Sequence, residues 1–401
     1  MIQGRRILCI ASRWDFDPTS KHQVMKQLMH RDNHVIWVNY HGTRRPGFSR
    51  RDLAAAWRTL GQSRRGPIRV SDRFTQMTPL LIPGRHEGWV GAINRRLVLA
   101  QIRAELRRAE RRDPRPLQIW TFAPDVAFLA GQFGEDCLVY YCVDEFSQFE
   151  CLDAATMQRR EGELIERCDV VVTTSEPLFE AKRRLHPNTH LVRHGVDTDH
   201  FGRALDADRP VPPDVADLAP PIFGFFGLLD HWFDEALLAD VAAATPDFSF
   251  VLIGQRRVPM PRLASLPNVR FLGRRPYEQL PDYCRAFDAG LLPFKRNAMT
   301  RCINPIKLRE YLAAGLPVVS TSLPEAMRYR PAVRLADDAE SFAEALTGLA
   351  GSLTPDRRRT IRRTVSDESW RCTVDRLDRI VLACASRGST AGTPRAALTV
   401  T

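Results

Sequence analysis

Short apolar segments alternate with helix-forming segments along almost the whole chain of 401 residues. The apolar segments are too short to be buried helices, and their near-continuous apolar character is typical of strands covered on both faces. This alternation predicts an α/β fold in which helices cover both faces of parallel sheets.

The predicted strands fall into two groups, separated by a segment dense in proline and aspartate. The strands of the first group are residues 6–11, 35–39, 117–121, 138–143, 170–174 and 189–192, and those of the second are 222–226, 249–253, 269–272, 289–293 and 317–321. Between them, the run from Asp206 to Asp214 and the pair Pro220-Pro221 break both helix and strand. We therefore predict two Rossmann-like domains, residues 1–205 and 222–365, joined by a linker at 206–221.

The end of the chain predicts one more helix. Trp370, Val374, Leu377 and Val381 recur at helical spacing, so we expect a closing helix over residues 366–386. Residues 387–401 are small and polar, and we expect a disordered tail there.

Composition places the chain among globular proteins of a reducing compartment. It is 44% hydrophobic and 26% charged, and its nine cysteines are scattered without a C-x-x-C pair. This pattern indicates neither a zinc site nor a disulfide framework, which favours the cytoplasm. We find no apolar window long enough to span a bilayer, so we expect a soluble or peripheral protein.

The net charge of +11 leaves two interpretations open. Arginine pairs recur through the first half beside apolar residues such as Trp89, a composition suited to an anionic membrane surface, here the inner face of the cell membrane. Solvated helix faces explain the same pairs slightly better. Nucleic acid is not an expected partner, because no recognition motif is present.

The segment from Asn304 to Ser320 is the most informative about function. It predicts a loop, a short helix, a glycine stop and a buried strand, and the helix would begin at the carboxyl edge of a sheet, where ligands bind. Lys307 and Glu310, three residues apart, would share one face of that helix. The cation can hold a diphosphate and the carboxylate a sugar hydroxyl, which is the chemistry of a nucleotide-sugar site. The alternative is an ordinary amphipathic helix with a solvated ion pair.

The context of this pair resembles the donor-site signature of GT-B glycosyltransferases, particularly the family 4-like group (glycosyltransferase group 1). The resemblance rests on Asn304-Pro305 before the helix, Ala313-Ala314-Gly315 at its end and Pro317-Val318-Val319 beyond it. It implies an α/β, GT-B fold with two Rossmann-like domains whose parallel sheets face a central cleft. It also implies a hexosyltransferase-like enzyme whose nucleotide sugar is a co-substrate, with no cofactor.

Two features of the sequence depart from that family. Many retaining members carry an acidic residue eight positions before the helix glutamate, where this chain has Cys302. A side-chain cation often follows the first glycine turn of the second domain, where this chain has Asp230 and His231. We expect metal-independent transfer, in which Lys307 and helix amides stabilise the leaving diphosphate.

The resemblance places further donor-binding residues at the ends of the second group of strands. Gly224 and Gly227 form a Gly-x-x-Gly turn that matches the family's diphosphate loop. Gly254 and Arg256 follow the next strand, and Gly273 follows the strand that lies beside the base in the family. The donor-binding set is then Gly224, Gly227, Gly254, Arg256, Gly273, Asn304, Lys307 and Glu310.

In the first domain, polar residues stand where the family has a glycine-rich loop. Ser20, Lys21 and His22 are the predicted acceptor-side residues, with helix capping by Thr19 or Ser20 as an equally good explanation. A buried strand also delivers Asp144 and Glu145 to the sheet edge amid aromatic residues. Desolvation there can prepare a base for an acceptor hydroxyl, so Asp144 is the first catalytic candidate and Glu145 the second. Alternatively, the two carboxylates only interact favourably with the dipole at the start of a helix.

Together these features predict transfer of a sugar from a nucleotide diphosphate to the hydroxyl of a sugar or lipid-linked acceptor, in bacterial cell-surface polysaccharide or glycolipid synthesis. The alternatives are a nucleotide-sugar epimerase on the same frame and a non-catalytic basic module that binds nucleotides or membranes. The lack of Gly-x-Gly-x-x-Gly after the first strand disfavours a dehydrogenase. The stereochemistry stays open: the family generally retains the anomeric configuration, whereas a base at Asp144 fits inversion.

Overall fold

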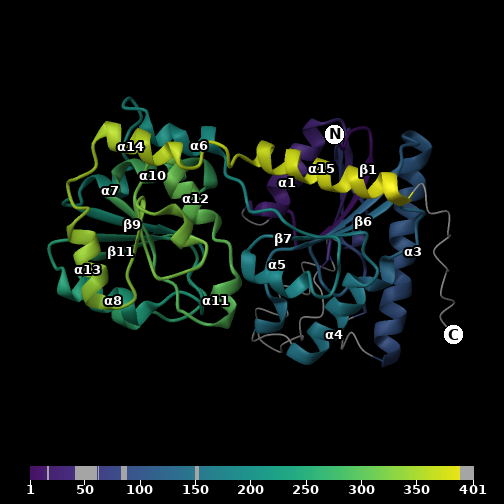
Figure 1. Ribbon diagram of the computed structural model, residues 1–401, viewed down its shortest axis with the longest axis horizontal. Coiled ribbons are helices and arrows are strands. Elements are labelled where there is room, and N and C mark those ends of the chain that lie inside the picture. The colour runs from purple at the N-terminus through teal and green to yellow at the C-terminus, as the bar shows by residue number, and fades with distance from the viewer. Residues whose placement is uncertain (16–17, 41–60, 62, 83–87, 150–152, 389–401) are drawn as a thin grey trace. The chain divides into compact units, whose positions relative to one another are not determined.

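The computed structural model describes residues 1–15, 18–40, 61, 63–82, 88–149 and 153–388 (Figure 1). The chain divides into two compact units, Met1–Arg193 with Thr373–Thr401, and His194–Cys372. Each unit is built around one sheet. No helix in the described ranges is both long and apolar enough to cross a membrane.

The sheet of the first unit has eight strands in the order β3-β4-β2-β1-β5-β6-β7-β8. All neighbouring pairs are parallel except β3 and β4. The strands are β1 Arg6–Ala11, β2 His34–Asn39, β3 Ile68–Ser71, β4 Phe74–Met77, β5 Leu117–Thr121, β6 Cys137–Cys142, β7 Val170–Thr173 and β8 Thr189–Leu191. Every residue of β1, β5 and β6 is buried, as expected for central strands with both faces covered.

The sheet of the second unit has six parallel strands in the order β11-β10-β9-β12-β13-β14. They are β9 Ile222–Phe226, β10 Ser249–Ile253, β11 Val269–Gly273, β12 Ala289–Leu292, β13 Val318–Ser320 and β14 Val333–Leu335. The order reverses between β9 and β12, so the carboxyl ends of β9, β10 and β12 meet at the switch point where ligands bind in such sheets.

Helices cover the sheets of both units. In the first unit they are α1 Ser20–His30, α3 Gly88–Arg112, α4 Ala154–Ile165, α5 Glu176–Lys182 and, for most of its length, α15 Trp370–Gly388. In the second unit they are α6 Thr198–Gly202, α7 Pro213–Ala216, α8 Glu235–Ala244, α9 Pro261–Ala264, α10 Leu280–Ala286, α11 Ala298–Cys302, α12 Ile306–Ala313, α13 Ala339–Thr347 and α14 Pro355–Arg363.

The predicted glycine stop at the end of α12 is confirmed. Gly315 has φ +72°, and its N–H donates to the carbonyl of Leu312 while the next N–H, of Leu316, donates to Tyr311. This pair of bonds is a Schellman cap, which uses the last free carbonyls of α12 and turns the chain into β13.

The closing helix begins at Trp370, a few residues after the predicted start, and runs to Gly388. Val374, Leu377 and Val381 are fully buried, as their helical spacing predicts. In Figure 1 this yellow helix lies beside α1, and Arg31 at the end of α1 pairs with Asp375 and Asp378. The chain therefore returns to the first unit. Residues 389–401, most of the predicted tail, lie outside the described residues.

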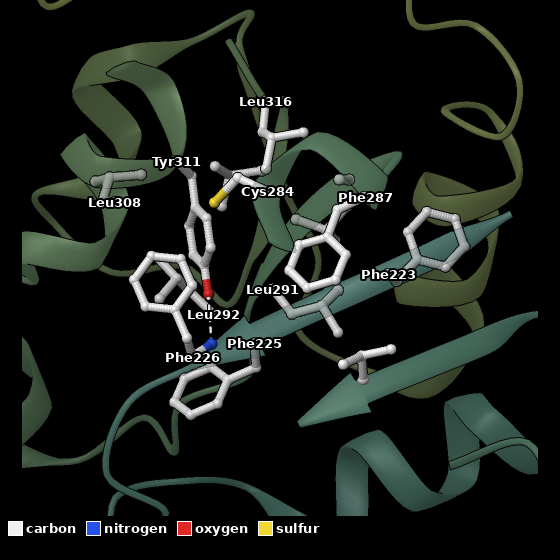
Figure 2. Close-up of a cluster of buried hydrophobic side chains, with 14 of the residues drawn as sticks. Phe223, Phe225, Phe226, Cys284, Phe287, Leu291, Leu292, Leu308, Tyr311 and Leu316 are labelled. Carbon is white, nitrogen blue, oxygen red and sulfur yellow. Dashed lines mark hydrogen bonds between the residues drawn. The ribbon is translucent and has the colours of Figure 1, made fainter. Parts of the chain in front are cut away.

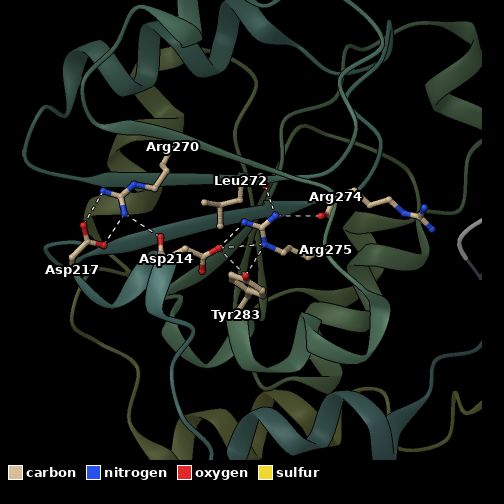
Figure 3. Close-up of polar contacts among 7 residues, drawn as sticks. All are labelled: Asp214, Asp217, Arg270, Leu272, Arg274, Arg275 and Tyr283. Carbon is tan, nitrogen blue, oxygen red and sulfur yellow. Dashed lines mark hydrogen bonds and ion pairs between the residues drawn. The ribbon is translucent and has the colours of Figure 1, made fainter.

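The predicted domain boundary is wrong by about a dozen residues, and the predicted linker belongs to the second unit. In Figure 3, Asp214 accepts hydrogen bonds from Arg275 and from the hydroxyl of Tyr283, and Asp217 pairs with Arg270. Val215 of α7 is 1% exposed. Proline and aspartate do break regular structure here, but ion pairs with residues about sixty positions later fix the segment to its own domain.

All the predicted strands are present to within one residue at each end. Three strands were missed, β3, β4 and β14. Every residue of β3 is exposed, and β14 has only three residues at the edge of its sheet. Edge strands of this kind lack a run of apolar residues, because they form by hydrogen bonding to one neighbouring strand and need not be buried.

Candidate functional site

Two glycines meet at the carboxyl edge of the second sheet. Gly227 follows β9 and Gly254 follows β10, with φ angles of +140° and +145°. A Cβ atom on Gly254 would lie 1.7 Å from the carbonyl oxygen of Gly227. Only glycine fits these backbone angles and this close approach, so the two turns form a tight, side-chain-free surface.

Lys307 lies directly on this surface. A Cβ atom on Gly227 would lie 1.7 Å from Cε and 2.6 Å from Nζ of Lys307. The lysine is in the first turn of α12, so its ammonium and the start of that helix bring positive charge to the same edge. The fold therefore brings together Gly227 and Lys307, two of the predicted donor-binding residues.

Glu310 lies one turn further along α12 and is 8% exposed. Desolvation raises the pKa of its carboxyl to about 7; the negative charge of Asp197 also raises it, and Lys307 opposes the shift. Glu310 is thus not the solvated partner of a surface ion pair. It is a buried carboxyl that carries a proton for part of the time near neutral pH.

A tyrosine of the same helix holds the strand that leads to Gly227. The hydroxyl of Tyr311 accepts a hydrogen bond of 3.0 Å from the N–H of Phe226, as Figure 2 shows. The ladder between β12 and β9 ends at Gly290 and Gly224, so this hydroxyl replaces the missing strand partner. Helix α12 therefore fixes the turn it faces as well as contributing Lys307.

Arg309 is a residue of this helix that the sequence analysis missed. Its side chain is fully buried and pairs with Glu368 at 2.6 Å and Glu325 at 3.5 Å. It also donates to the side-chain oxygen of Asn304. Because a buried cation needs such partners, Arg309 anchors the face of α12 opposite to Lys307. Its two charged partners, Glu325 and Glu368, lie 16 and 59 positions later in the sequence, so no local signal pointed to their pairing with Arg309.

The other four predicted donor-binding residues have surroundings that differ from one to the next. Gly224 lies inside β9, where the ring of Phe287 fills the space of a side chain, so this glycine serves packing and not ligand approach. Gly273 ends β11 with φ +68° and open space beside it. The guanidinium of Arg256 lies 4.6 Å from the ring centre of Phe271. Asn304 is 5% exposed and bonded to Arg309, which gives it a supporting role.

In the first unit, Asp144 follows β6 at the carboxyl edge of the sheet and is half-buried. Desolvation raises the pKa of its carboxyl to about 6, and the positive charge of Lys21 opposes the shift. Lys21, in the first turn of α1, is itself half-buried, and burial lowers the pKa of its ammonium against the attraction of Asp144. The fold therefore brings Asp144, the first catalytic candidate, close to Lys21, a predicted acceptor-side residue that lies more than 120 positions earlier in the sequence.

Glu145, the second catalytic candidate, is bound by other groups. It accepts from the hydroxyl of Ser147 at 2.7 Å and from Lys182 at 2.9 Å. Desolvation raises the pKa of this carboxyl, but Lys182 and Ser147 outweigh it and leave the pKa below its usual value. Lys182 also pairs with buried Glu161 at 2.8 Å. A carboxylate held this way is a poor proton acceptor, so the geometry favours Asp144.

The capping alternative is confirmed at the start of α1. The backbone N–H of Thr19 donates to Nδ1 of His22, and Nε2 of His22 lies 3.2 Å from the carbonyl oxygen of Trp14. Burial lowers the pKa of His22 to about 4, with Lys21 adding to the shift, so the ring is neutral near pH 7. His22 and Ser20 are both buried, which leaves Lys21 as the member of this trio with a charge near Asp144.

The arginine pairs are concentrated on one helix. Arg95-Arg96, Arg107-Arg108 and Arg111-Arg112 all lie on α3, and Trp89, which is 74% exposed, lies at the start of the same helix. Two other pairs, Arg44-Arg45 and Arg50-Arg51, lie outside the described residues. Within the described ranges, no group of three or more His, Cys, Asp or Glu side chains could hold a metal ion.

Comparison with known proteins finds a sequence family that is similar to the second unit. The sequence family "Glycosyl transferases group 1" matches residues 220–352, which include both glycine turns and α12. A putative teichuronic acid biosynthesis glycosyltransferase, TuaH of Bacillus subtilis strain 168, is 25% identical over 279 residues, which are 63% of this chain and 69% of the relative. The second unit is therefore similar to the group 1 glycosyltransferases over most of its length.

Solved structures extend the likeness of the fold to nearly the whole chain. Sucrose-phosphate synthase from Thermosynechococcus elongatus superposes with a TM-score of 0.65 at 16% identity, covering 97% of this chain and 100% of the other. Anabaena Alr3699/HepE, solved in complex with UDP and glucose, gives 0.66 at 14% identity over 94% and 99%. At these identities the likeness establishes the fold, and it confirms the predicted GT-B class with two Rossmann-like domains.

Proposed function

We propose that the second domain binds a nucleotide diphosphate sugar and that the enzyme transfers its hexosyl group to an acceptor hydroxyl bound by the first domain. The observation that carries this proposal is the contact of Lys307 with the Gly227 turn, at the strand edge where ligands bind. Backbone N–H groups and an ammonium together suit a diphosphate. The UDP and glucose bound to the similar Anabaena protein support the same class of donor.

In the proposed reaction, the bond between the anomeric carbon and the diphosphate oxygen breaks, and the diphosphate leaves with the electron pair. Lys307 and the N-terminal amides of α12 stabilise the negative charge that develops on it, without a metal ion. Glu310 binds a hydroxyl of the donor. Its proton lets it donate a hydrogen bond as well as accept one.

We assign the general base to Asp144. The acceptor hydroxyl forms the new bond to the anomeric carbon, and its proton moves to the carboxylate. A pKa near 6 leaves this carboxylate mostly ionised at neutral pH while keeping it more basic than an ordinary aspartate. Since a base of this kind fits in-line displacement, we expect inversion at the anomeric carbon.

The similarity to a teichuronic acid glycosyltransferase favours an acceptor in cell-surface polysaccharide synthesis, carried by a sugar or a lipid. Assembly at the inner face of the cell membrane fits the exposed Trp89 and the arginine pairs of α3. Sedimentation with vesicles of anionic phospholipid tests this placement. Trp89→Ala should weaken binding, and equal binding to neutral vesicles would contradict it.

A nucleotide-sugar panel tests the proposed donor by protection against thermal unfolding. A ligand at one hundred times its Kd adds about 2.7 kcal/mol to apparent stability. We expect one nucleotide sugar to raise Tm and Lys307→Met to abolish the rise, whereas Lys295→Met, an exposed lysine of the same domain, leaves it intact. An equal Tm rise in both variants would contradict the assignment. Product analysis then separates a transferase, which needs an acceptor, from an epimerase.

A further inference from the structure

Two cysteines from distant parts of the sequence meet in the first unit. Cys137 begins β6, and Cys384 lies in the last turns of α15, more than 240 positions later. Their two thiols are hydrogen-bonded to each other. The sulfur atoms are therefore neighbours, although no spacing such as C-x-x-C announces the pair in the sequence.

Other hydrogen bonds hold Cys384 at the same place. Its Sγ donates to the carbonyl oxygen of Asp169 at 3.4 Å and accepts from Nδ2 of Asn188 at 3.5 Å. Asp169 is bonded to the residue that follows Cys137: its carboxylate accepts from the N–H of Leu138 at 2.7 Å, and its own N–H donates to the carbonyl of Leu138 at 2.9 Å. These bonds place Cys384 beside the start of β6 independently of the contact between the thiols.

The cysteine pair lies at the amino edge of the first sheet. Cys137 is the first residue of β6, and Asp169 and Asn188 directly precede β7 and β8. Asp144 comes after the opposite end of β6, and the two ends of this strand are about 17 Å apart at the usual rise per residue. The pair is therefore separate from the proposed transfer site.

The two thiols differ in exposure and in their hold on the proton. Cys137 is 1% exposed, whereas Cys384 is half-buried. The hydrogen bond with Cys384 raises the pKa of Cys137, and burial raises it further. Because the thiolate is the nucleophile in disulfide exchange, Cys384 is the sulfur that reacts first with a molecule from solution. Cys137 is placed to attack the product.

We propose that Cys137 and Cys384 form a reversible disulfide that fastens the end of α15 to the sheet of the first unit. The thiolate of Cys384 first attacks one sulfur of a small-molecule disulfide, such as oxidised glutathione, and one small thiolate leaves. The sulfur of Cys137 then attacks Sγ of Cys384, and its proton passes to the second leaving thiolate. Two protein thiols are oxidised to one disulfide, and the small disulfide is reduced to two thiols.

The position of α15 gives this bond a consequence. The helix begins at Trp370, whose N–H donates to the carbonyl of Val196 in the second unit, and its later turns belong to the first unit. A covalent bond at Cys384 would add to the longer sulfur contacts that hold its end. Closing so long a loop restricts the unfolded chain, so we expect oxidation to stabilise the protein. In a reducing compartment, such a bond serves as a redox switch.

Incubation of the full chain with oxidised glutathione tests the pair. Peptide mapping without reduction should recover one linked pair of peptides that contains Cys137 and Cys384. We expect Cys384→Ser to abolish this link and Cys137→Ala to stop at a mixed disulfide between glutathione and Cys384. Cys372→Ser, at a half-buried cysteine of the same helix, is the matched control and should leave the link intact.

Thermal unfolding before and after oxidation measures the effect on stability. Tm should rise on oxidation in the parent protein and in Cys372→Ser but stay the same in Cys384→Ser. Glutathione on Cys384 of the parent without a link to Cys137, or a link that persists in Cys384→Ser, would overturn the proposal. A linked protein with an unchanged Tm would refute the fastening of α15. These readouts involve no sugar transfer, so their outcome is independent of the proposed function.

Discussion

The side chain of Lys307 occupies the space that a side chain on Gly227 would need, with Cε 1.7 Å from the position of a Cβ atom there. The two residues are eighty positions apart in sequence and come from different elements, the end of β9 and the start of α12. Helix α12 also holds the end of β9 through Tyr311, so the same helix supplies the lysine and fixes the turn.

Gly227→Ala should therefore damage donor binding by displacing Lys307. We expect KM for the nucleotide sugar to rise at least tenfold and the free energy of unfolding to fall by about 1–3 kcal/mol, because φ is +140° at this position. Gly351→Ala is the matched control, since φ is +61° there and the space beside it is open. Similar losses of donor affinity in both variants would show that backbone strain and not the contact with Lys307 matters.

Glu310→Gln should make the protein more stable at alkaline pH while reducing turnover. Burial raises the pKa of Glu310 from 4.5 to about 7, so the unfolded chain ionises first and stability falls as pH rises between those values. Above pH 7 the buried charge costs about 3 kcal/mol, which glutamine removes.

Chemical unfolding at pH 4 and pH 8 measures this difference. The stabilisation by Glu310→Gln should appear at pH 8 and vanish at pH 4, whereas Glu344→Gln, an exposed position of α13, should have little effect at either pH. A loss of stability at pH 8 would contradict the buried, partly protonated state of Glu310.

Asp144→Asn should lower kcat by about 100-fold or more, as expected for the loss of a general base. In the parent enzyme, kcat/KM should rise with pH through about 6 as Asp144 loses its proton. Initial rates across pH 5 to 8 check this, and the rise near pH 6 should be absent from the residual rate of Asp144→Asn. A rise that persists unchanged in the variant would assign it to another group, such as Glu310.

Lys182→Met should destabilise the first domain without changing the pH dependence of turnover. The substitution leaves buried Glu161 and half-buried Glu145 without their shared cation, which costs about 3–5 kcal/mol when a buried pair is broken. Arg183→Met, next in the chain and exposed, is the control. Thermal unfolding measures the difference, and a Tm equal to that of the control would mean that the network carries no net stability.

Much of the architecture could be read from local pattern. Continuous apolar runs such as residues 6–11 and 222–226 specify central strands, because strands buried on both faces admit few polar residues. The edge strands β3 and β14 lack such runs and were missed. The domain boundary failed for a related reason: the proline-rich segment around Asp214 is fixed by Arg275 and Tyr283, and long-range ion pairs leave no local trace.

The sequence by itself determined the α/β class, the glycine stop at Gly315 and the pairing of Lys307 with Glu310 on one helix face, since each depends on residues a few positions apart. Only the tertiary structure decided what surrounds them. The fold brings Lys307 into contact with Gly227 and buries Glu310. It pairs Glu145 with Lys182, whereas Asp144 has no such ion pair with any described residue, and it brings the thiols of Cys137 and Cys384 together. Desolvation and charge pairing act between residues that are close in space, and the sequence order of those residues does not reveal that closeness.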